Sequence, residues 1–450
     1  MTKDLTTGSP MKLIVGFTIP ILLGMLFQQF YNMMDTMIVG KLLGASALAS
    51  VGATGSINFF VIGFCMGVCN GFAIPVAQRM GAGDYSQLRR CVANAGWLSA
   101  LFAVVLTAVT CLLCPQILTL MQTPADIYDG AYQYIFVIFL GIPTTFLYNL
   151  LAGIIRSLGD SKTPVYFLAM ASCLNIVLDL VLILFCDTGV AGAAIATVIS
   201  QGVSGVACLA FMIRKYPILR MSREERRING RTCWMLCYMG VPMGLQYSIT
   251  AIGSIVLQSA VNQLGSGYVA AVAAGTKLFQ VICCPYEAMG ATMATYCGQN
   301  VGALKLDRLG QGVRSCILLG FGYAALALGV LLLFAPQLAL LFLDADEGDL
   351  IGYTAQYITI LGMFFCLLTL VNILRFSIQG MGYSNLAIIA GVLEMAARMA
   401  VGLLLVPAVG FIGACFASPA AWLMADLFLV PATVGCIKAL KKRYGQGAPT

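Results

Sequence analysis

The feature that most constrains this chain is a succession of apolar runs of about 20 residues or more, separated by short polar, glycine- and proline-containing breaks. Hydrophobic residues make up 60% of the chain and charged residues only 10%, whereas a soluble domain carries about 25% charged residues. A helix needs about 20 apolar residues to cross the hydrocarbon core of a bilayer. We therefore expect an integral membrane protein of transmembrane helices, with no large soluble domain.

Charges, turns and glycine or proline breaks divide the chain into twelve expected spans. These are residues 13–38, 46–72, 91–114, 130–155, 164–186, 190–213, 233–260, 268–297, 313–336, 353–380, 386–406 and 411–437. The longest polar stretch, 214–231, separates the sixth span from the seventh. We expect an N-lobe over 1–213, a linker over 214–232, and a C-lobe with a basic tail over 233–450.

Lysine and arginine predict the orientation, because positive residues concentrate on the cytoplasmic side. With the N-terminus inside, 21 of them fall in inner segments and only Lys41 falls in an outer loop. The outer loops hold acids instead, namely Asp126, Asp129, Asp187, Asp344, Asp346, Glu347 and Asp349. Both termini are expected in the cytoplasm. The net charge of +7 then reflects this bias rather than nucleic-acid binding.

The two halves of the chain resemble each other at an offset near 221 residues. Gln78-Arg79-Met80-Gly81-Ala82 matches Gln299-Asn300-Val301-Gly302-Ala303, and similar short matches follow in the same order along both halves. Each half holds six spans, so both enter the membrane from the same side. The sequence predicts an all-α membrane protein with twelve transmembrane helices. They would form two parallel six-helix bundles, related by a pseudo-two-fold axis along the membrane normal.

Small residues recur within the expected spans. Gly63, Gly67 and Gly71 are four residues apart and share one helix face. Small residues on one face allow membrane helices to approach closely. We interpret this glycine face as a packing surface and not as a binding site.

The N-terminal half carries polar groups at depths where charge is costly. Asp35 and Asp179 lie in apolar spans, Asn175 is one helical turn before Asp179, and Thr197 is seven residues into the next span. Two carboxylates, an amide and a hydroxyl suit a proton or Na⁺, since hard cations prefer oxygen ligands. Interhelical hydrogen bonding without ion binding is the structural alternative.

The C-terminal half holds a second set of charged residues within its spans: Lys277, Glu287, Glu394, Arg398 and Asp426. Glu394 and Arg398 are four residues apart and are expected to pair. Glu287 is a candidate for meeting a cationic substrate. Lys277 could extend to the surface or pair with Glu287. The sequence leaves the role of Asp426 open.

Several function classes lack support in the sequence. The chain has no histidine, so a histidine relay or a His-ligated metal is excluded. Cys111 and Cys114 lie within a span, where cysteine behaves as a small hydrophobe. No nucleophile–base set or nucleotide-binding motif is visible. We therefore expect neither an enzyme nor a cofactor.

The chain resembles the multidrug and toxic compound extrusion (MATE) family, and most closely its DinF-like branch. The stretches that carry the resemblance run in order along both halves: 28–40 with 44–49, 78–84, 156–164, Asn175-x-x-x-Asp179, 189–197, 298–303 and 379–382. The resemblance implies two six-helix bundles. It also implies alternating-access export of amphipathic, often cationic, compounds in exchange for H⁺ or Na⁺.

Under this resemblance Asp35, Asn175, Asp179 and Thr197 match the N-lobe proton or cation site, where Na⁺ is the metal to consider. Some branches carry an acid in the first helix of the second half. Here that region reads Gln246, Tyr247, Ser248 and Thr250, so Glu287 and Glu394 become the acids to consider.

The expected setting is a prokaryotic-type plasma membrane. The expected partners are small amphipathic substrates and bilayer lipid, without nucleic acid, and the protein is expected to be a monomer. A lipid-linked precursor flippase of the wider superfamily is the alternative. It would need a basic cavity, whereas the charges at mid-membrane depth are mainly acidic.

Overall fold

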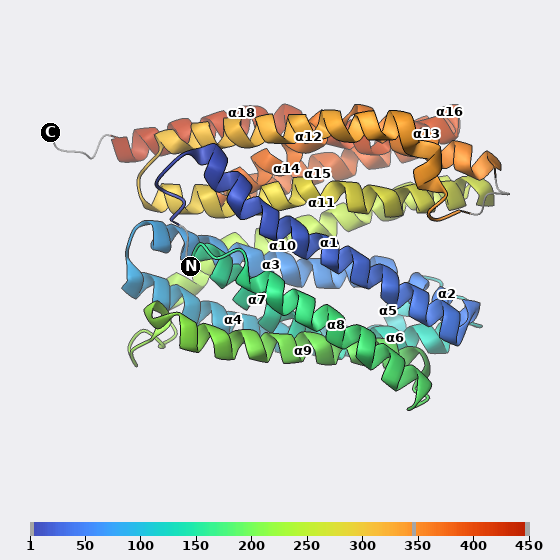
Figure 1. The fold of residues 1–450 in the computed structure, drawn as a ribbon, viewed down its shortest axis with the longest axis horizontal. Coiled ribbons are helices and arrows are strands. Elements are labelled where there is room, and N and C mark those ends of the chain that lie inside the picture. Colours follow the sequence, from blue (N-terminus) through green and yellow to red (C-terminus); the bar gives the residue numbers. More distant parts are fainter. Residues whose placement is uncertain (1–3, 344–347, 446–450) are drawn as a thin grey trace. The chain divides into compact units, whose positions relative to one another are not determined.

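The computed structural model describes residues 4–343 and 348–445, and all regular elements within them are helices (Figure 1). The expected loop acids Asp344, Asp346 and Glu347 lie outside the described residues. The described part forms two compact units. Unit 1 contains residues 23–248, and unit 2 contains residues 5–22 and those from 249 onward. The chain passes between the units inside two long helices. The lobe boundaries expected at 213 and 233 stay a prediction.

The elements before the second half are mostly long helices joined by short turns. They are α1 Pro10–Leu43, α2 Ala45–Ala53, α3 Gly55–Gly81, α4 Tyr85–Leu112, α5 Cys114–Leu120, α6 Tyr128–Leu140, α7 Ile142–Ser157, α8 Thr163–Leu184, α9 Gly189–Lys215 and the 3₁₀ turn η1 Pro217–Leu219.

The elements of the second half follow the same plan. They are α10 Gly230–Asn262, α11 Ser266–Gly302, α12 Asp307–Ala339, α13 Gly348–Met363, α14 Phe365–Gly380, α15 Ser384–Ala400, the π-helical turn η2 Val401–Leu405, α16 Val406–Val409, α17 Phe411–Cys415 and α18 Ala417–Gly445.

Ten helical stretches in the described residues are long and apolar enough to cross a membrane. Two bent pairs, α6 with α7 and α13 with α14, bring the number to twelve if each pair forms one span. The predicted all-helical membrane fold is therefore confirmed. The sequence did not reveal the bends of 47° and 55° in these pairs.

The first bend has a visible cause in the sequence, whereas the second does not. Gly141 ends α6, and Pro143, which lacks an N–H, stands at the start of α7. The second pair breaks at Phe364 without a proline. The two breaks occupy corresponding places in the two halves, so the bend is part of the repeat.

The glycine face on α3 packs against the part of α10 that belongs to unit 1. A Cβ atom added at Gly67 would lie 2.5 Å from the Met243 carbonyl oxygen. One added at Gly71 would lie 2.4 Å from Gly240 Cα. Only glycine permits this backbone-to-backbone approach. The interpretation of this face as a packing surface is confirmed.

The repeated Gln-containing motif of the second half holds the start of the chain within unit 2. Gln299 Oε1 accepts from the Leu5 backbone N–H at 3.1 Å, and Asn300 Nδ2 donates to the Leu5 carbonyl at 3.2 Å. Lys305 Nζ donates to the Thr6 carbonyl at 2.9 Å. Leu5 is fully buried. The motif therefore fixes the segment that precedes α1.

The loop before α8 is organised by Asp160. Its Oδ1 accepts from the backbone N–H groups of Lys162 and Thr163, each at 3.0 Å. Its Oδ2 accepts from Thr163 Oγ1 and Tyr216 Oη, each at 2.6 Å. Burial alone would raise the pKa of Asp160, but these hydrogen bonds outweigh it and lower the pKa. The acid therefore stays ionised and fixes the start of α8.

Candidate functional site

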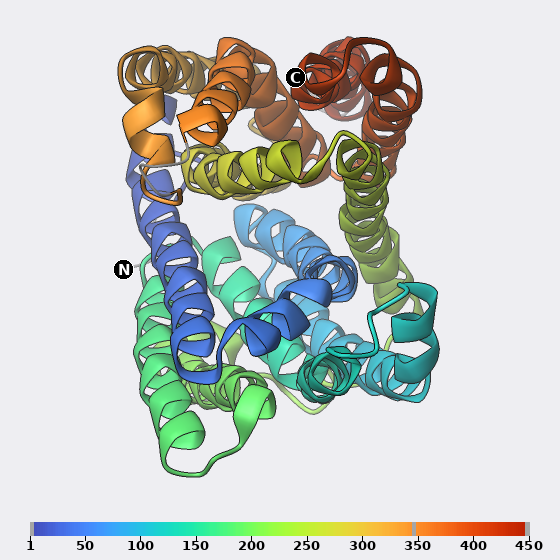
Figure 2. The same cartoon turned by 90° about the vertical axis from the view of Figure 1, so that its right-hand side faces the viewer.

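The four N-lobe residues predicted from the sequence lie on three helices of unit 1. Asp35 lies on α1, Asn175 and Asp179 on α8, and Thr197 on α9. Helices α8 and α9 pack side by side as a hairpin, drawn in green in Figure 2. The hairpin turns sharply at the start of α9, where Gly189 has φ +59°. The turn brings Thr197 next to Asn175.

Asn175 links the two helices of this hairpin. In the amide orientation that satisfies both of its atoms, its nitrogen donates to Asp179 Oδ2 at 3.0 Å. Its oxygen then accepts from Thr197 Oγ1 at 3.2 Å and from the Thr197 backbone N–H at 3.1 Å. Asn175 and Asp179 are almost completely buried. The amide therefore holds one Asp179 oxygen at a fixed position inside the unit.

Asp35 and Asp179 face each other closely enough for their side chains to hydrogen bond. Two carboxylates cannot donate to each other, so this contact requires a proton on one of them. One oxygen of each acid, Asp35 Oδ1 and Asp179 Oδ1, is buried without a hydrogen-bond partner. A buried acceptor without a donor is unfavourable unless something binds it. The pair can therefore accept a proton or a cation.

The surroundings of the two acids differ. Asp179 is fully buried, whereas Asp35 and Thr197 are half-buried. Asp35 is therefore the more accessible of the two acids. This asymmetry suits a site that exchanges its occupant.

Tyr31 is a member of the cluster that the sequence analysis missed. Its hydroxyl lies 3.4 Å from Thr197 Oγ1, which ties α1 to α9. Tyr31 stands one helical turn before Asp35 on the same face of α1. This four-residue spacing could have indicated from the sequence that Tyr31 belongs to the cluster.

The cluster meets the ligand requirements of Na⁺ only in part. Carboxylate and hydroxyl oxygens are ligands that a hard cation accepts. The Asn175 oxygen, however, is already engaged by Thr197. Among the described residues no group of three or more Cys, Asp or Glu side chains could hold a metal. The two free oxygens fit a shared proton well and Na⁺ less completely.

A second buried cluster lies in unit 2 and contains three of the predicted C-lobe residues. Glu394 on α15 pairs with Arg398 at 3.8 Å, as the four-residue spacing predicted. It also pairs with Arg375 on α14, a partner that the sequence did not reveal. Asp426 on α18 interacts electrostatically with Arg375, and both of its oxygens are buried without a hydrogen bond. The cluster therefore brings two acidic and two basic side chains together inside unit 2.

Glu287 and Lys277 are not part of this cluster. Both lie on α11, and both side chains are exposed. The ion pairs of the described residues do not include either of them. The structure therefore does not bring Lys277 and Glu287 together as a pair.

These features define a helical membrane protein with an ionisable acid pair inside its apolar part. A family model, MatE, matches residues 20–181 and 242–404, which is more than half of the chain. The chain therefore belongs to the MatE family, the MATE family that the sequence resembles. The model matches at corresponding places in both halves, in agreement with the internal repeat.

Curated relatives carry transport names. The chain is 29% identical over 373 residues to the probable multidrug resistance protein YpnP of Bacillus subtilis (strain 168), covering 80% of each chain. It is 29% identical to YoeA of the same organism, also named a probable multidrug resistance protein, covering 76% of each. It is 24% identical to an FAD transporter of Shewanella oneidensis, covering 78% of each.

Solved structures share the fold. One is the outward-facing conformation of a multidrug resistance MATE family transporter of the MOP superfamily. It superposes with a TM-score of 0.92 at 23% identity, covering 98% of this chain and 99% of that one. A crystal structure of MATE in complex with MaL6 gives a TM-score of 0.89 at 24% identity, covering 98% and 100%. At these identities the likeness concerns the fold.

Proposed function

We propose that this protein is a secondary active exporter of amphipathic, often cationic, organic compounds. It would exchange them for H⁺ or Na⁺ by alternating access. The observation that carries the proposal is the facing pair Asp35 and Asp179, with one unpartnered buried oxygen on each acid. Membership of the family and the names of the relatives support the same class of function. Membership of the DinF-like branch is the finer part of the proposal.

The orientation belongs to the proposal as well. The distribution of lysine and arginine supports a cytoplasmic position for both termini and the linker. The setting is a prokaryotic-type plasma membrane and the unit of function a monomer. Substrate would be released outside as the ion enters.

The proton is the preferred coupling ion. The contact between the Asp35 and Asp179 side chains needs a proton on one of them, and the Asn175 oxygen is not free for Na⁺. Binding of the ion must differ between the two conformations for exchange to be coupled. Protonation removes the repulsion between the two carboxylates, so α1 and α8 can approach each other only when the proton is bound.

The C-lobe residues have separate proposed roles. Glu287, exposed on α11, is the proposed contact for a cationic substrate. Lys277, exposed on the same helix, is proposed to extend to the surface. Glu394, Arg398 and Asp426 form the proposed structural or gating group of unit 2. The acidic N-lobe pair favours export of cations over the flippase alternative, which needs a basic cavity.

The proposal is tested in proteoliposomes with ethidium as the cationic probe. A pH gradient and a Na⁺ gradient are imposed separately at zero membrane potential. We expect the pH gradient alone to drive ethidium movement against its concentration. Transport driven only by Na⁺ would change the coupling ion, and transport driven by neither gradient would contradict the antiport function.

A further inference from the structure

The segment between the halves is a built part of unit 1 and carries a dense positive charge. We call residues 214–231 the basic strap. Its seven cations all have exposed side chains: Arg214, Lys215, Arg220, Arg223, Arg226, Arg227 and Arg231. Among the residues that the structure describes, none of the seven forms an ion pair. Their charges are therefore available to a partner.

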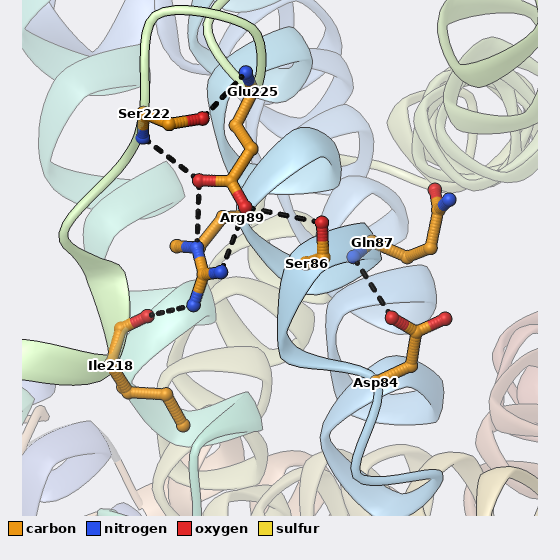
Figure 3. Close-up of polar contacts among 7 residues, drawn as sticks. All are labelled: Asp84, Ser86, Gln87, Arg89, Ile218, Ser222 and Glu225. Atoms are coloured by element: carbon orange, nitrogen blue, oxygen red, sulfur yellow. Dashed lines mark hydrogen bonds and ion pairs between the residues drawn. The ribbon is translucent and has the colours of Figure 1, made fainter.

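A buried carboxylate fixes the strap to α4. Arg89 donates to Glu225 through Nε to Oε2 at 2.8 Å and through Nη2 to Oε1 at 2.7 Å (Figure 3). The Glu225 carboxylate also accepts from Ser86 Oγ at 3.1 Å and from the Ser222 backbone N–H at 2.9 Å. Arg89 Nη1 reaches the Ile218 carbonyl at 3.3 Å. A bidentate pair of this kind fixes the orientation of the two side chains as well as the distance between them.

Further bonds hold the strap by its backbone. The Asn229 N–H donates to Asn94 Oδ1 at 2.9 Å, and Asn94 Nδ2 donates to the Arg227 carbonyl at 3.4 Å. Trp97 Nε1 donates to the Arg226 carbonyl at 3.1 Å. Because α4 holds the main chain of Arg226 and Arg227, their guanidinium groups remain outside. The strap therefore presents arginines from a fixed backbone rather than from a free linker.

Two indole rings accompany the strap. Trp97 is 55% exposed and Trp234, three residues after the strap, is 73% exposed. Exposed tryptophan is typical of the headgroup region, where the ring meets apolar chains and the N–H meets polar groups. Fixed arginines beside exposed indoles match a bilayer surface better than a water-filled space.

We propose that the basic strap binds the phosphate groups of anionic lipids at the inner leaflet. Arginine recognises phosphate with two donors at once, and clusters of four to eight basic residues next to a membrane helix attract anionic headgroups. The side of the membrane rests on the proposed orientation, but binding itself does not require transport. Arg89 and Glu225 act as positioning residues, because they hold the backbone and do not contact the lipid.

The experiment uses the full chain in bilayers in which the acyl chains of one lipid class carry bromine, which quenches nearby tryptophan. The chain has three tryptophans. Trp422→Phe removes the one that is buried in unit 2 and leaves Trp97 and Trp234 as reporters. We expect brominated phosphatidylglycerol to quench them several-fold more effectively than brominated phosphatidylcholine. Equal quenching by the two lipids would overturn the proposal.

Charge removal supplies the next arm. The variant Arg223→Gln/Arg226→Gln/Arg227→Gln is expected to lower the preference for the anionic lipid to about 1, which is no preference. The matched control Lys438→Gln/Lys442→Gln/Arg443→Gln removes three exposed cations from α18 and is expected to keep the preference. A preference that survives in the strap variant would contradict the proposal.

Two neighbouring acids separate a built surface from simple attraction by net charge. Glu225→Gln and Glu224→Gln change the net charge equally, but only Glu225 holds the strap, whereas Glu224 is exposed. The proposal expects Glu225→Gln to lower the lipid preference and Glu224→Gln to maintain or raise it. A rise in both would show that charge alone acts and that the strap is not a built site.

A final arm distinguishes lipid from soluble phosphate, which offers the same chemistry. Inorganic phosphate and glycerol phosphate are added to the anionic bilayers at constant ionic strength. We expect quenching to remain, since the indoles and arginines act on the surface together. Loss of the preference with soluble phosphate would assign the strap to a free anion instead. Every readout is independent of ethidium transport, so failure here leaves the proposed antiport untouched.

Discussion

Asp35 on α1 and Asp179 on α8 face each other within unit 1, and Asn175 holds one Asp179 oxygen at 3.0 Å. One oxygen of each acid, Asp35 Oδ1 and Asp179 Oδ1, is buried without a hydrogen-bond donor. A proton satisfies this arrangement with the least change.

Asp35→Asn and Asp179→Asn should abolish coupled efflux while the protein still folds and inserts. Asparagine keeps the size of the side chain but cannot exchange a proton. The measurement is ethidium efflux and resistance in cells that express equal amounts of each protein. Asp126→Asn, which changes an exposed acid in a loop, should behave as wild type. Full resistance in the Asp35 variant would refute the assignment.

Gly71→Ala should destabilise unit 1. The added Cβ would lie 2.4 Å from Gly240 Cα, so the helix backbones must separate, at a cost of about 1–3 kcal/mol. Gly96→Ala on α4 is the control, because nothing lies within 4 Å of its Cβ. Thermal unfolding in detergent should show a lower midpoint for the first variant and an unchanged or higher one for the second. Equal midpoints would contradict the close approach of the two helix backbones at Gly71.

The Arg89–Glu225 pair should give stability that depends on pH. Hydrogen bonds from Arg89 lower the pKa of Glu225 from its ordinary 4.5 to about 2. A lowered carboxyl pKa stabilises the fold above the unfolded value and is lost as pH falls toward the folded value. Glu225→Gln should therefore cost about 1–3 kcal/mol at pH 7.

The difference in midpoint between wild type and Glu225→Gln should shrink as pH falls from 4.5 toward 2. Thermal melts between pH 7 and pH 3 provide the measurement, with Glu224→Gln as the control that shows no such pattern. A difference that stays constant down to pH 3 would argue against the ion pair.

The buried cluster of unit 2 should show strong coupling between Arg375 and Glu394. Arg375→Met alone leaves Glu394 buried with only Arg398 at 3.8 Å, which should cost about 3–5 kcal/mol. The double variant Arg375→Met/Glu394→Gln removes both charges and should recover much of this loss. Unfolding midpoints of the four proteins form a double-mutant cycle. Additive effects would mean that the two side chains do not interact.

Much of the fold could be predicted because its signals are local. Apolar length predicts the spans, and four-residue spacing predicts the Asn175–Asp179 face and the Glu394–Arg398 pair. Tyr31 could have been predicted in the same way, because it is four residues before Asp35 in the sequence. The turn before α9 made Thr197 predictable, because a short hairpin places residues at similar depth.

The rest depends on packing between distant parts of the chain. Arg375 meets Glu394 from another helix, and no spacing rule connects them. Arg89 and Glu225 are 136 residues apart. The sequence therefore indicated only a polar loop for the linker, although the linker is fixed to α4. The bend at Phe364 could not be predicted, because no proline lies at the break.

The most direct test of the central claim measures protons rather than transport. Purified protein in weakly buffered detergent is mixed with ethidium, and the pH of the solution is followed. If ethidium and the proton favour different conformations, ethidium binding should release protons from the Asp35–Asp179 pair of the wild type and none from Asp35→Asn/Asp179→Asn. Proton release from the double variant equal to that of the wild type would contradict the account.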